Sequence, residues 1–238
     1  MKEKVKYKDI GLMDYKEAWD YQTRVHNVIK DKKLKNRSLA REDIAQLDRN
    51  HHLIFCQHHP VYTLGKSGSA DHLLLNNIEL EEKGFSYYKI NRGGDITYHG
   101  PGQLVAYPIF DLDWFFHDVH KYVRLLEEVI IKTLDSYELR ASRIEGYTGV
   151  WFKGSNVLPK RKICAIGVHM SRWVTLHGLA FNINPDLSHF NNIVPCGIND
   201  ADKIVTSLSH ELEREIDFLK VSKKVKYYFS EVFDFEFA

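Results

Sequence analysis

Apolar side chains recur along the chain at two spacings, one typical of amphipathic helices and the other of β-strands. The helical spacing begins after Asp14, which together with Glu17 has the pattern of an N-terminal capping box. It returns in a strongly periodic stretch over 118–139 and again over 211–231. These stretches predict three helices, each burying one stripe of side chains.

Short β-like runs fill most of the remaining chain, and turn-forming residues separate them. They predict strands at 3–10, 53–57, 61–64, 85–90, 104–110, 149–153, 162–168 and 173–182. The glycine-rich stretch 91–102 is expected to be a loop, and the polar stretch 30–50 to be the end of the first helix and a solvated connection. No internal repeat or low-complexity tract interrupts the pattern, so we predict one domain, 1–238, of α+β class with a β centre flanked by helices.

Composition narrows the class of protein. With 44% hydrophobic and 27% charged residues the chain can build a substantial core, and its net charge of +1 argues against a protein that grips nucleic acid. The lysine-rich N-terminus lacks an apolar segment behind it, and no run of 18 apolar residues occurs. Three cysteines without a CxxC pair fit a reducing compartment. We therefore expect a cytoplasmic protein that binds neither nucleic acid nor membrane.

Thirteen histidines invite a metal site, but their spacing does not favour one. The pairs His51-His52 and His58-His59 are adjacent rather than four residues apart on a helix, and no HExxH motif occurs. We predict no metal.

Three segments contain more glycine, histidine and isolated polar residues than folding requires. They are RGGDITYHGPGQ at 92–103, KICAIG at 162–167, and the stretch from HGLA at 177–180 to PCG at 195–197. Glycines allow a backbone to approach a ligand closely, although a Gly-Gly pair is equally typical of a plain hairpin turn. The first segment does not match a phosphate-binding loop, so a nucleotide site is not indicated.

Cys196, between proline and glycine in a predicted loop, is the cysteine most suited to chemistry. Cys56 and Cys164 lie in apolar runs, where burial is the commoner fate. A thiol titrates near ~8.5, so a nucleophilic cysteine needs a partner that raises its thiolate fraction. Lys162 can serve if it is partly desolvated, although an isolated lysine at a strand end is more often only solvated.

The segment at 92–103 resembles the signature of bacterial lipoyl(octanoyl) transferases, the octanoyl-acyl-carrier-protein:protein N-octanoyltransferases. Four further blocks are similar to that family's, in its order: HPVYTLG at 59–65, KICAIG at 162–167, HGLAFN at 177–182 and IVPCGI at 193–198. The resemblance covers about 50–212, and five ordered blocks make chance agreement improbable.

The resemblance implies a mixed β-sheet flanked by helices, as in the catalytic domain of biotin and lipoate protein ligases. It implies that Cys196 accepts an acyl group and that Lys162 lowers the thiol pKa and shuttles protons. The implied acyl pocket consists of Arg92, Gly93, Gly94, Asp95, Ile96, Thr97, Tyr98, His99, Ala165, Ile166, Gly167, Gly178, Leu179 and Ala180. Backbone N–H groups near Gly167 or Gly178 are candidates to stabilise an oxyanion.

The implied reaction moves octanoyl from the phosphopantetheine of an acyl carrier protein to a lysine. The acceptors would be apo lipoyl domains of 2-oxoacid dehydrogenases and the glycine cleavage H protein. A thioester donor is already activated, so no cofactor of the enzyme's own is expected, and we expect a monomer. We also predict that Lys160, Arg161 and Arg172 form a basic patch for the acidic carrier.

Three other interpretations remain. An ATP-dependent lipoate or biotin ligase on the same fold would need no cysteine nucleophile, and a non-catalytic carrier-binding module would need neither Cys196 nor Lys162. A papain-type hydrolase is disfavoured because its cysteine would begin a helix. The segments 30–50 and 154–161 are longer than in many family members, which affects docking surfaces rather than chemistry.

Overall fold

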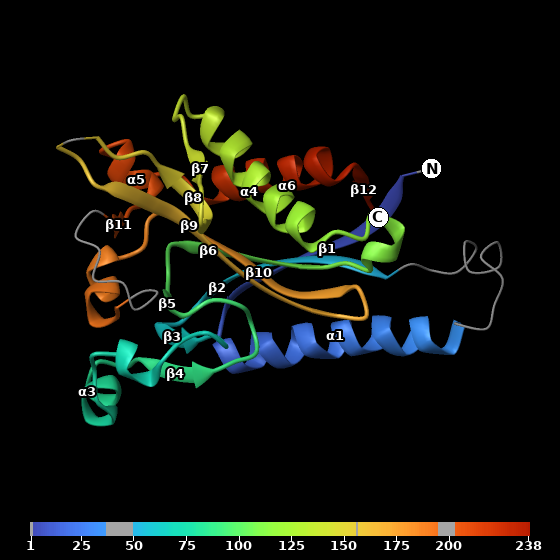
Figure 1. Cartoon of the computed structure of the whole chain (residues 1–238), viewed down its shortest axis with the longest axis horizontal. Coiled ribbons are helices and arrows are strands. Elements are labelled where there is room, and N and C mark those ends of the chain that lie inside the picture. The colour runs from blue at the N-terminus through green and yellow to red at the C-terminus, as the bar shows by residue number, and fades with distance from the viewer. Residues whose placement is uncertain (1, 37–49, 156, 195–202) are drawn as a thin grey trace.

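The computed structural model describes residues 2–36, 50–155, 157–194 and 203–238, and a large mixed sheet dominates these ranges. Nine strands form it there, in the order β12-β1-β2-β6-β10-β9-β8-β7 with β11 beside β9 (Figure 1). Their bounds are β1 Glu3–Met13, β2 His51–His58, β6 Gln103–Ile109, β7 Ser142–Ile144, β8 Tyr147–Phe152, β9 Lys160–Ser171, β10 Val174–Asn182, β11 Lys203–Val205 and β12 Phe235–Phe237. Strand β1 pairs in parallel with β2 and β12, and β11 with β9, whereas the other neighbours are antiparallel. The predicted α+β class with a mixed sheet is confirmed.

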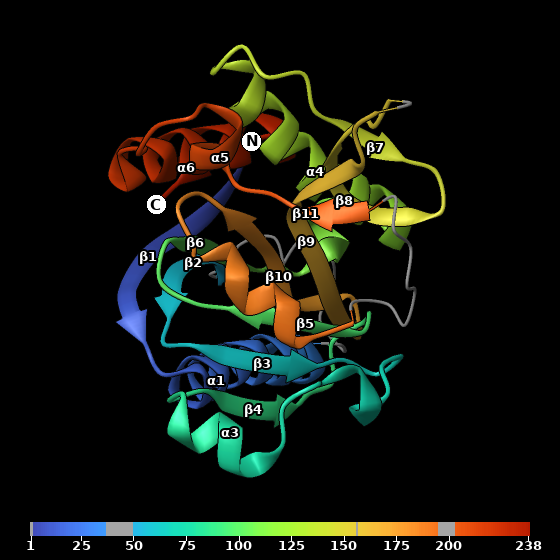
Figure 2. The same ribbon diagram turned by 90° about the vertical axis from the view of Figure 1, so that its left-hand side faces the viewer.

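A second sheet has the order β4-β3-β5 and packs beside the short helix α3 (Asn77–Glu82), as Figure 2 shows. Its strands are β3 Val61–Leu64, β4 Ser86–Lys89 and β5 Ile96–His99. Strand β5 lies inside the stretch 91–102, so the prediction of an uninterrupted loop there was wrong. Ile96, Thr97 and Tyr98 favour strands, but a run of only four residues between glycine clusters is too short to predict, and antiparallel pairing with β3 decides its conformation.

Helices cover both faces of the large sheet. Helix α1 (Tyr15–Lys35) lies on one face, and α4 (Val119–Asp135) and α6 (Phe218–Phe233) lie on the other (Figure 1). The main core is built between the sheet and the α4–α6 side, and a smaller core lies under α1. The small sheet is joined to the large sheet at β9, where the N–H of Gly93, shortly before β5, donates to the Val168 carbonyl.

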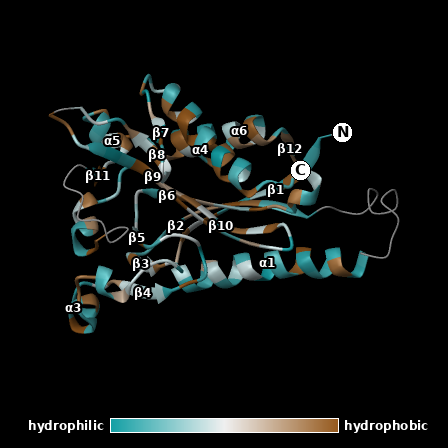
Figure 3. Ribbon diagram, viewed as in Figure 1, coloured by the Kyte–Doolittle hydropathy of each residue, from teal (hydrophilic) through white to brown (hydrophobic). Residues whose placement is uncertain are grey.

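Helix α1 begins where the capping pattern predicts. The Asp14 side chain accepts hydrogen bonds from the backbone N–H groups of Lys16 and Glu17, which satisfies donors that the first turn leaves open. The buried stripe includes Ala18 and Ile29, whereas most outward positions are polar, and Figure 3 shows this alternation along the helix. Val28 and Leu34 are exposed apolar exceptions. The helix therefore gains its stability from packing on the sheet.

The C-terminal helix prediction was wrong between 212 and 217. A short helix, α5 (Leu208–Glu211), ends just before this range, and Glu213 has a left-handed backbone with φ 52°. The next helix, α6, begins at Phe218 with Asp217 as its N-cap. Ile216 exchanges two hydrogen bonds with the Asn184 side chain, a long-range contact that helical periodicity cannot reveal. Helix α4 similarly ends four residues before its predicted end.

Short 3₁₀ turns occupy Ala70–His72, Leu112–Trp114 and Leu187–Asn192. In the described ranges no helix combines the length and apolarity that a membrane span requires.

Candidate active site

A cavity of about 280 Å³ lies where the glycine-rich segment meets β9 and β10. This volume is near the lower end of the roughly 300–1,000 Å³ typical of small-molecule sites. Of the residues predicted from the sequence, those that line it are Arg92, Gly94, Asp95, Ile96, Thr97, His99, Lys162, Ala165, Ile166, Gly167, Gly178, Leu179 and Ala180. The structure therefore brings together three segments that are up to about ninety residues apart.

Two predicted pocket residues do not line the cavity. The Gly93 backbone N–H donates to the Val168 carbonyl at 2.9 Å and so joins the glycine loop to β9. The Tyr98 ring is buried in the core of the small sheet, and its hydroxyl lies 2.7 Å from Nδ1 of His189. Both residues support the wall from behind.

The glycine-rich segment at 92–103 is hydrogen-bonded to the residues that directly follow the HPVYTLG block at 59–65. The N–H groups of Lys66 and Ser67 donate to the carbonyls of Arg92 and Gly94, at 3.0 and 3.2 Å. A Cβ added at Gly65 would lie 2.2 Å from the Gly94 carbonyl oxygen, so only glycine permits this approach. Two sequence blocks thus form one structural unit.

Charged side chains of the loop are held by neighbours. Arg92 is buried and donates to the Thr63 carbonyl at 2.6 Å and to the Thr63 hydroxyl at 3.0 Å. The Asp95 carboxylate lies 2.7 Å from Nδ1 of His72 and also accepts from the Ile96 N–H. These contacts fix the loop while its backbone faces the cavity.

Lys162 occupies the cavity wall near the start of β9. Its Nζ lies 4.5 Å from the centre of the Trp151 ring on β8, close enough for a cation–π contact. Gly149, at φ 118°, lies beside the lysine: an added Cβ would make ordinary contact with the lysine Cε at 3.7 Å, but it would clash with the Cys164 carbonyl oxygen at 2.5 Å. The prediction that Lys162 borders a pocket, rather than being a solvated strand end, agrees with this geometry.

Cys196 lies outside the described residues. On either side of its segment, Ile193 and Val205 both line the cavity, and Val205 is paired with Lys162. The two other cysteines are buried, as predicted, and burial raises the pKa of the Cys56 and Cys164 thiols far above the usual range. Neither is suited to act as a nucleophile near neutral pH.

A set of buried polar side chains, which we call the polar floor, lies under the cavity and consists of His99, Gln103 and Asn182. His99 Nδ1 donates to the Gln103 side-chain oxygen at 2.7 Å, and the Gln103 amide donates to Asn182 at 2.8 Å. Burial, with a smaller contribution from neighbouring His58, lowers the pKa of His99 to about 3. The floor is therefore uncharged at neutral pH.

His177 has a left-handed backbone, with φ 62°, in the middle of β10. Its N–H donates to the Gln22 side chain on α1 at 3.0 Å, and its Nε2 lies 2.8 Å from the Asn91 side-chain oxygen. Burial lowers the pKa of His177 to about 3, and Arg92 lowers it further. A Cβ at the next residue, Gly178, would lie 2.1 Å from the Ala106 carbonyl oxygen. The left-handed backbone of His177 and the close approach at Gly178 thus determine the path of β10 beside the cavity.

Sequence reasoning missed several lining residues. They include Tyr15, Gln103, Tyr107, Gly146, Tyr147, Thr148, Asn182, Phe190, Ile193 and Val205. Gln103 could have been found, because it is the one polar residue at the head of the apolar run 104–110. Tyr15 could not, because in sequence it is an ordinary core position of a helix.

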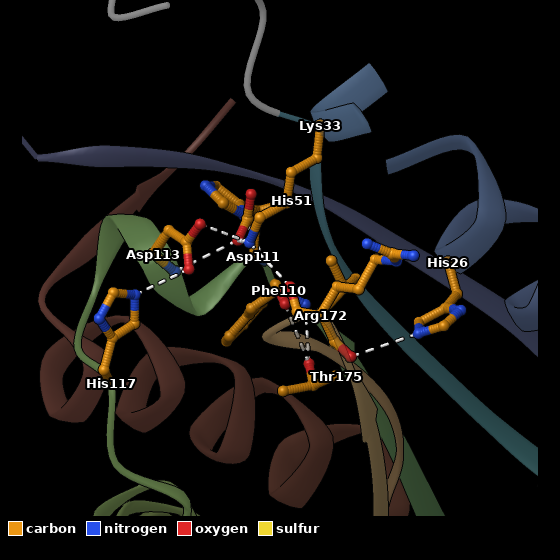
Figure 4. A network of polar contacts seen from close by, with 10 residues as sticks. His26, Lys33, His51, Phe110, Asp111, Asp113, His117, Arg172 and Thr175 are labelled. Carbon is orange, nitrogen blue, oxygen red and sulfur yellow. Dashed lines mark hydrogen bonds and ion pairs between the residues drawn. The ribbon is translucent and has the colours of Figure 1, made fainter. Parts of the chain in front are cut away.

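The predicted basic patch of Lys160, Arg161 and Arg172 is wrong. From Arg161 to Ser171, ten residues at about 3.3 Å each place the two ends of β9 roughly 33 Å apart. Arg172 lies at the far hairpin, where its carbonyl accepts from Lys33, which also pairs with Asp111 (Figure 4). Arg161 is engaged by Glu211 at 2.7 Å and is mostly buried.

Within the described ranges, no three or more His, Cys, Asp or Glu side chains are grouped so that they could hold a metal ion. The cavity wall carries the amine of Lys162, the guanidinium of Arg92, the carboxylate of Asp95, neutral polar side chains and backbone N–H groups.

Residues 14–230 match the family model described as the lipoyl protein ligase A/B catalytic domain. A protein of Cytophaga hutchinsonii named octanoyltransferase is 55% identical over 213 residues, which cover 90% of this chain and 86% of that protein. An octanoyltransferase of Christiangramia forsetii is 52% identical over 99% of this chain and 98% of the relative. Among solved structures, a bipartite lipoate protein ligase from Thermoplasma acidophilum superposes with a TM-score of 0.69 at 15% identity, covering 99% of this chain and 86% of that one. That last match concerns the fold alone.

Proposed function

The chain belongs to the octanoyltransferases of the lipoyl protein ligase A/B catalytic domain family and is an acyltransferase, and we propose that it works through a thioester on Cys196. Octanoyl transfer in protein lipoylation follows from the family, with lipoyl-domain proteins as acceptors. The donor we propose is octanoyl on the phosphopantetheine of an acyl carrier protein. The acceptors we propose are lysines of 2-oxoacid dehydrogenase lipoyl domains and of the glycine cleavage H protein.

The observation that carries this proposal is the position of Lys162. It lines the same cavity as Ile193 and Val205, the described residues that flank the Cys196 segment on either side. The remaining cysteines, Cys56 and Cys164, are sealed in the core. A cysteine nucleophile at this cavity would therefore be Cys196.

The reaction proceeds in two halves. Lys162, in its neutral amine form, takes the proton of the Cys196 thiol, and the thiolate attacks the donor carbonyl. The carbon–sulfur bond to pantetheine then breaks, and Lys162 returns the proton to the leaving sulfur. One thioester replaces another, so this half requires no energy-rich cofactor.

In the second half the amine of the acceptor lysine attacks the acyl-cysteine. Lys162 takes the proton lost by that amine and delivers it to the departing Cys196 sulfur, and a stable amide remains. The oxyanion donors we propose are backbone N–H groups near Gly167 and Gly178, two residues that line the cavity.

Intact-mass analysis tests the proposal. After a single turnover with octanoyl carrier protein and no acceptor, the protein should gain one octanoyl group, and Cys196→Ala should gain none. Lys162→Ala should acylate slowly at neutral pH although it is folded. An octanoyl adduct on Cys196→Ala, or unchanged transfer by it, would disprove the thioester.

The rival ATP-dependent ligase is separated by the same assay. Transfer from the carrier thioester should proceed in nucleotide-free buffer, whereas a ligase would join free octanoate only when ATP is present. A non-catalytic binder would give neither product.

A further inference from the structure

Arg161 and Glu211 form a two-pronged ion pair between β9 and α5. Arg161 Nε lies 2.7 Å from Glu211 Oε1, and Nη2 lies 2.9 Å from Oε2. The two side chains are 18% and 10% exposed. Such fork-to-fork pairs are more directional than single ion pairs, and side chains this well shielded from water are screened less by salt.

The pair is linked to Lys162 through Thr206. The Thr206 hydroxyl donates to Glu211 Oε1 at 2.7 Å, and its backbone N–H donates to the Lys162 carbonyl at 2.9 Å. Burial opposes the charge of Glu211, but hydrogen bonds from Arg161 and Thr206 outweigh it and lower the pKa of the carboxyl. Glu211 is thus a fixed anion at neutral pH.

Thr206 is held from the other side by the polar floor. Its carbonyl accepts from the Asn182 side chain at 3.0 Å, and Asn182 in turn accepts from Gln103. The residue therefore connects β9, β10 and α5 at one point, and its side chain is fully buried.

The pair does not touch the cavity. Successive residues of a strand point to opposite faces, so Arg161 faces away from the cavity that Lys162 lines. The guanidinium instead lies 5.5 Å from the centre of the Phe152 ring. Any effect of the pair on chemistry must pass through the backbone.

We propose that Arg161, Glu211 and Thr206 are positioning residues of the transfer reaction. Together they hold β11, which directly follows the segment of Cys196, in register with β9, and so they set the relation between that segment and Lys162. This inference rests on the proposed function, in which Lys162 and Cys196 exchange a proton. The three residues contact no substrate.

Thiol alkylation as a function of pH tests the inference on the whole protein. Because Cys56 and Cys164 are buried, iodoacetamide labelling followed by intact mass should report on Cys196. Glu211→Gln and Thr206→Val should move the midpoint of the labelling rate upward by about one pH unit. Since one unit is a tenfold change in thiolate, acyl-enzyme formation at pH 7 should fall about tenfold, and most of the loss should disappear at pH 9.

A matched control separates positioning from simple loss of stability. Asp111→Asn removes the carboxylate of another shielded ion pair, with Lys33, at the far end of β9 and β10 (Figure 4). Its labelling midpoint should equal that of the wild type, whatever its melting temperature. Thr206→Val removes only one hydroxyl and remains informative if Glu211→Gln unfolds.

Lys162→Ala provides the reference shift. If Lys162→Ala raises the midpoint but Glu211→Gln and Thr206→Val do not, the positioning role is excluded and the proposed function stands. If Lys162→Ala leaves the midpoint unchanged, the role of Lys162 fails, and this inference fails with it.

Discussion

The carboxylate of Glu127 accepts a hydrogen bond from the backbone N–H of Gly149 at 3.0 Å. Glu127 belongs to α4 and is fully buried, and Gly149 belongs to β8 beside Lys162. Arg124 and Arg143 neutralise the carboxylate at 2.7 and 3.0 Å. A helix of the core thus holds the part of β8 that lies next to the proposed catalytic lysine.

Replacing Glu127 by alanine should destabilise the protein strongly. The change leaves the Gly149 N–H without its partner and breaks a buried ion pair, so the free energy of unfolding should fall by about 3 kcal/mol. Urea denaturation measures it. The neighbouring Glu128→Ala is the control, because Glu128 also contacts Arg143 but is 34% exposed. Its effect should stay below about 1 kcal/mol, and equal effects would contradict this account.

Gly149→Ala should damage both stability and activity. The φ of 118° disfavours any side chain, and the added Cβ would lie 2.5 Å from a backbone oxygen, so we expect a loss of about 3 kcal/mol. Gly84→Ala, at φ 70° with open space around it, should cost only about 1 kcal/mol and leave acyl transfer unchanged. Thermal melting and single-turnover acylation compare the two variants.

Acid should destabilise the protein between about pH 6.5 and pH 4. Burial lowers the pKa of His58 to about 4 and those of His99 and His177 to about 3, whereas unfolded histidines titrate near 6.5. The unfolded chain therefore binds more protons in this range, and each histidine contributes a slope of up to about 1.4 kcal/mol per pH unit. The stabilisation is complete above pH 6.5 and is lost as the pH falls.

Urea titrations at several pH values measure that slope. His99→Gln should reduce the slope of unfolding free energy against pH by up to about 1.4 kcal/mol per pH unit, because one titrating group is removed. An unchanged slope would mean that the His99 environment does not exclude the proton.

Ala165→Leu should change the preferred acyl length. Ala165 lines a cavity of only about 280 Å³, and a larger side chain would occupy space for the tail. Octanoyl has four methylenes more than butanoyl, each worth about 0.8 kcal/mol when buried. The ratio of kcat/KM for octanoyl over butanoyl carrier should fall by up to about two-hundredfold, and a constant ratio would show that the tail lies elsewhere.

Much of the fold could be predicted from periodicity alone. The helix after Asp14 and the strongly amphipathic helix over 119–135 lie where apolar spacing and capping place them. The short strands β5, β11 and β12 could not be predicted, because they owe their conformation to distant partners. The break between α5 and α6 likewise depends on Asn184, about thirty residues away.

The residues that line the cavity were predicted better than the residues behind them, such as Arg161 and Tyr98. The family resemblance of five ordered sequence blocks pointed to Lys162 and to about half of the lining residues. Arg161 was misjudged, since nothing in sequence reveals that its guanidinium meets Glu211 fifty positions later. Tyr98 was named as lining because neighbours in a strand share a motif but not a face.

The polar floor has a consequence for how an aliphatic tail could enter. Its side chains are hydrogen-bonded to one another and to backbone carbonyl groups of Tyr98 and Thr206. Such a surface is chemically polar, but few of its donors and acceptors remain for water. Removing water from it should therefore cost little free energy. We therefore expect a hydrocarbon chain to cover the polar floor at a smaller cost in hydration than it would over polar groups that still bind water.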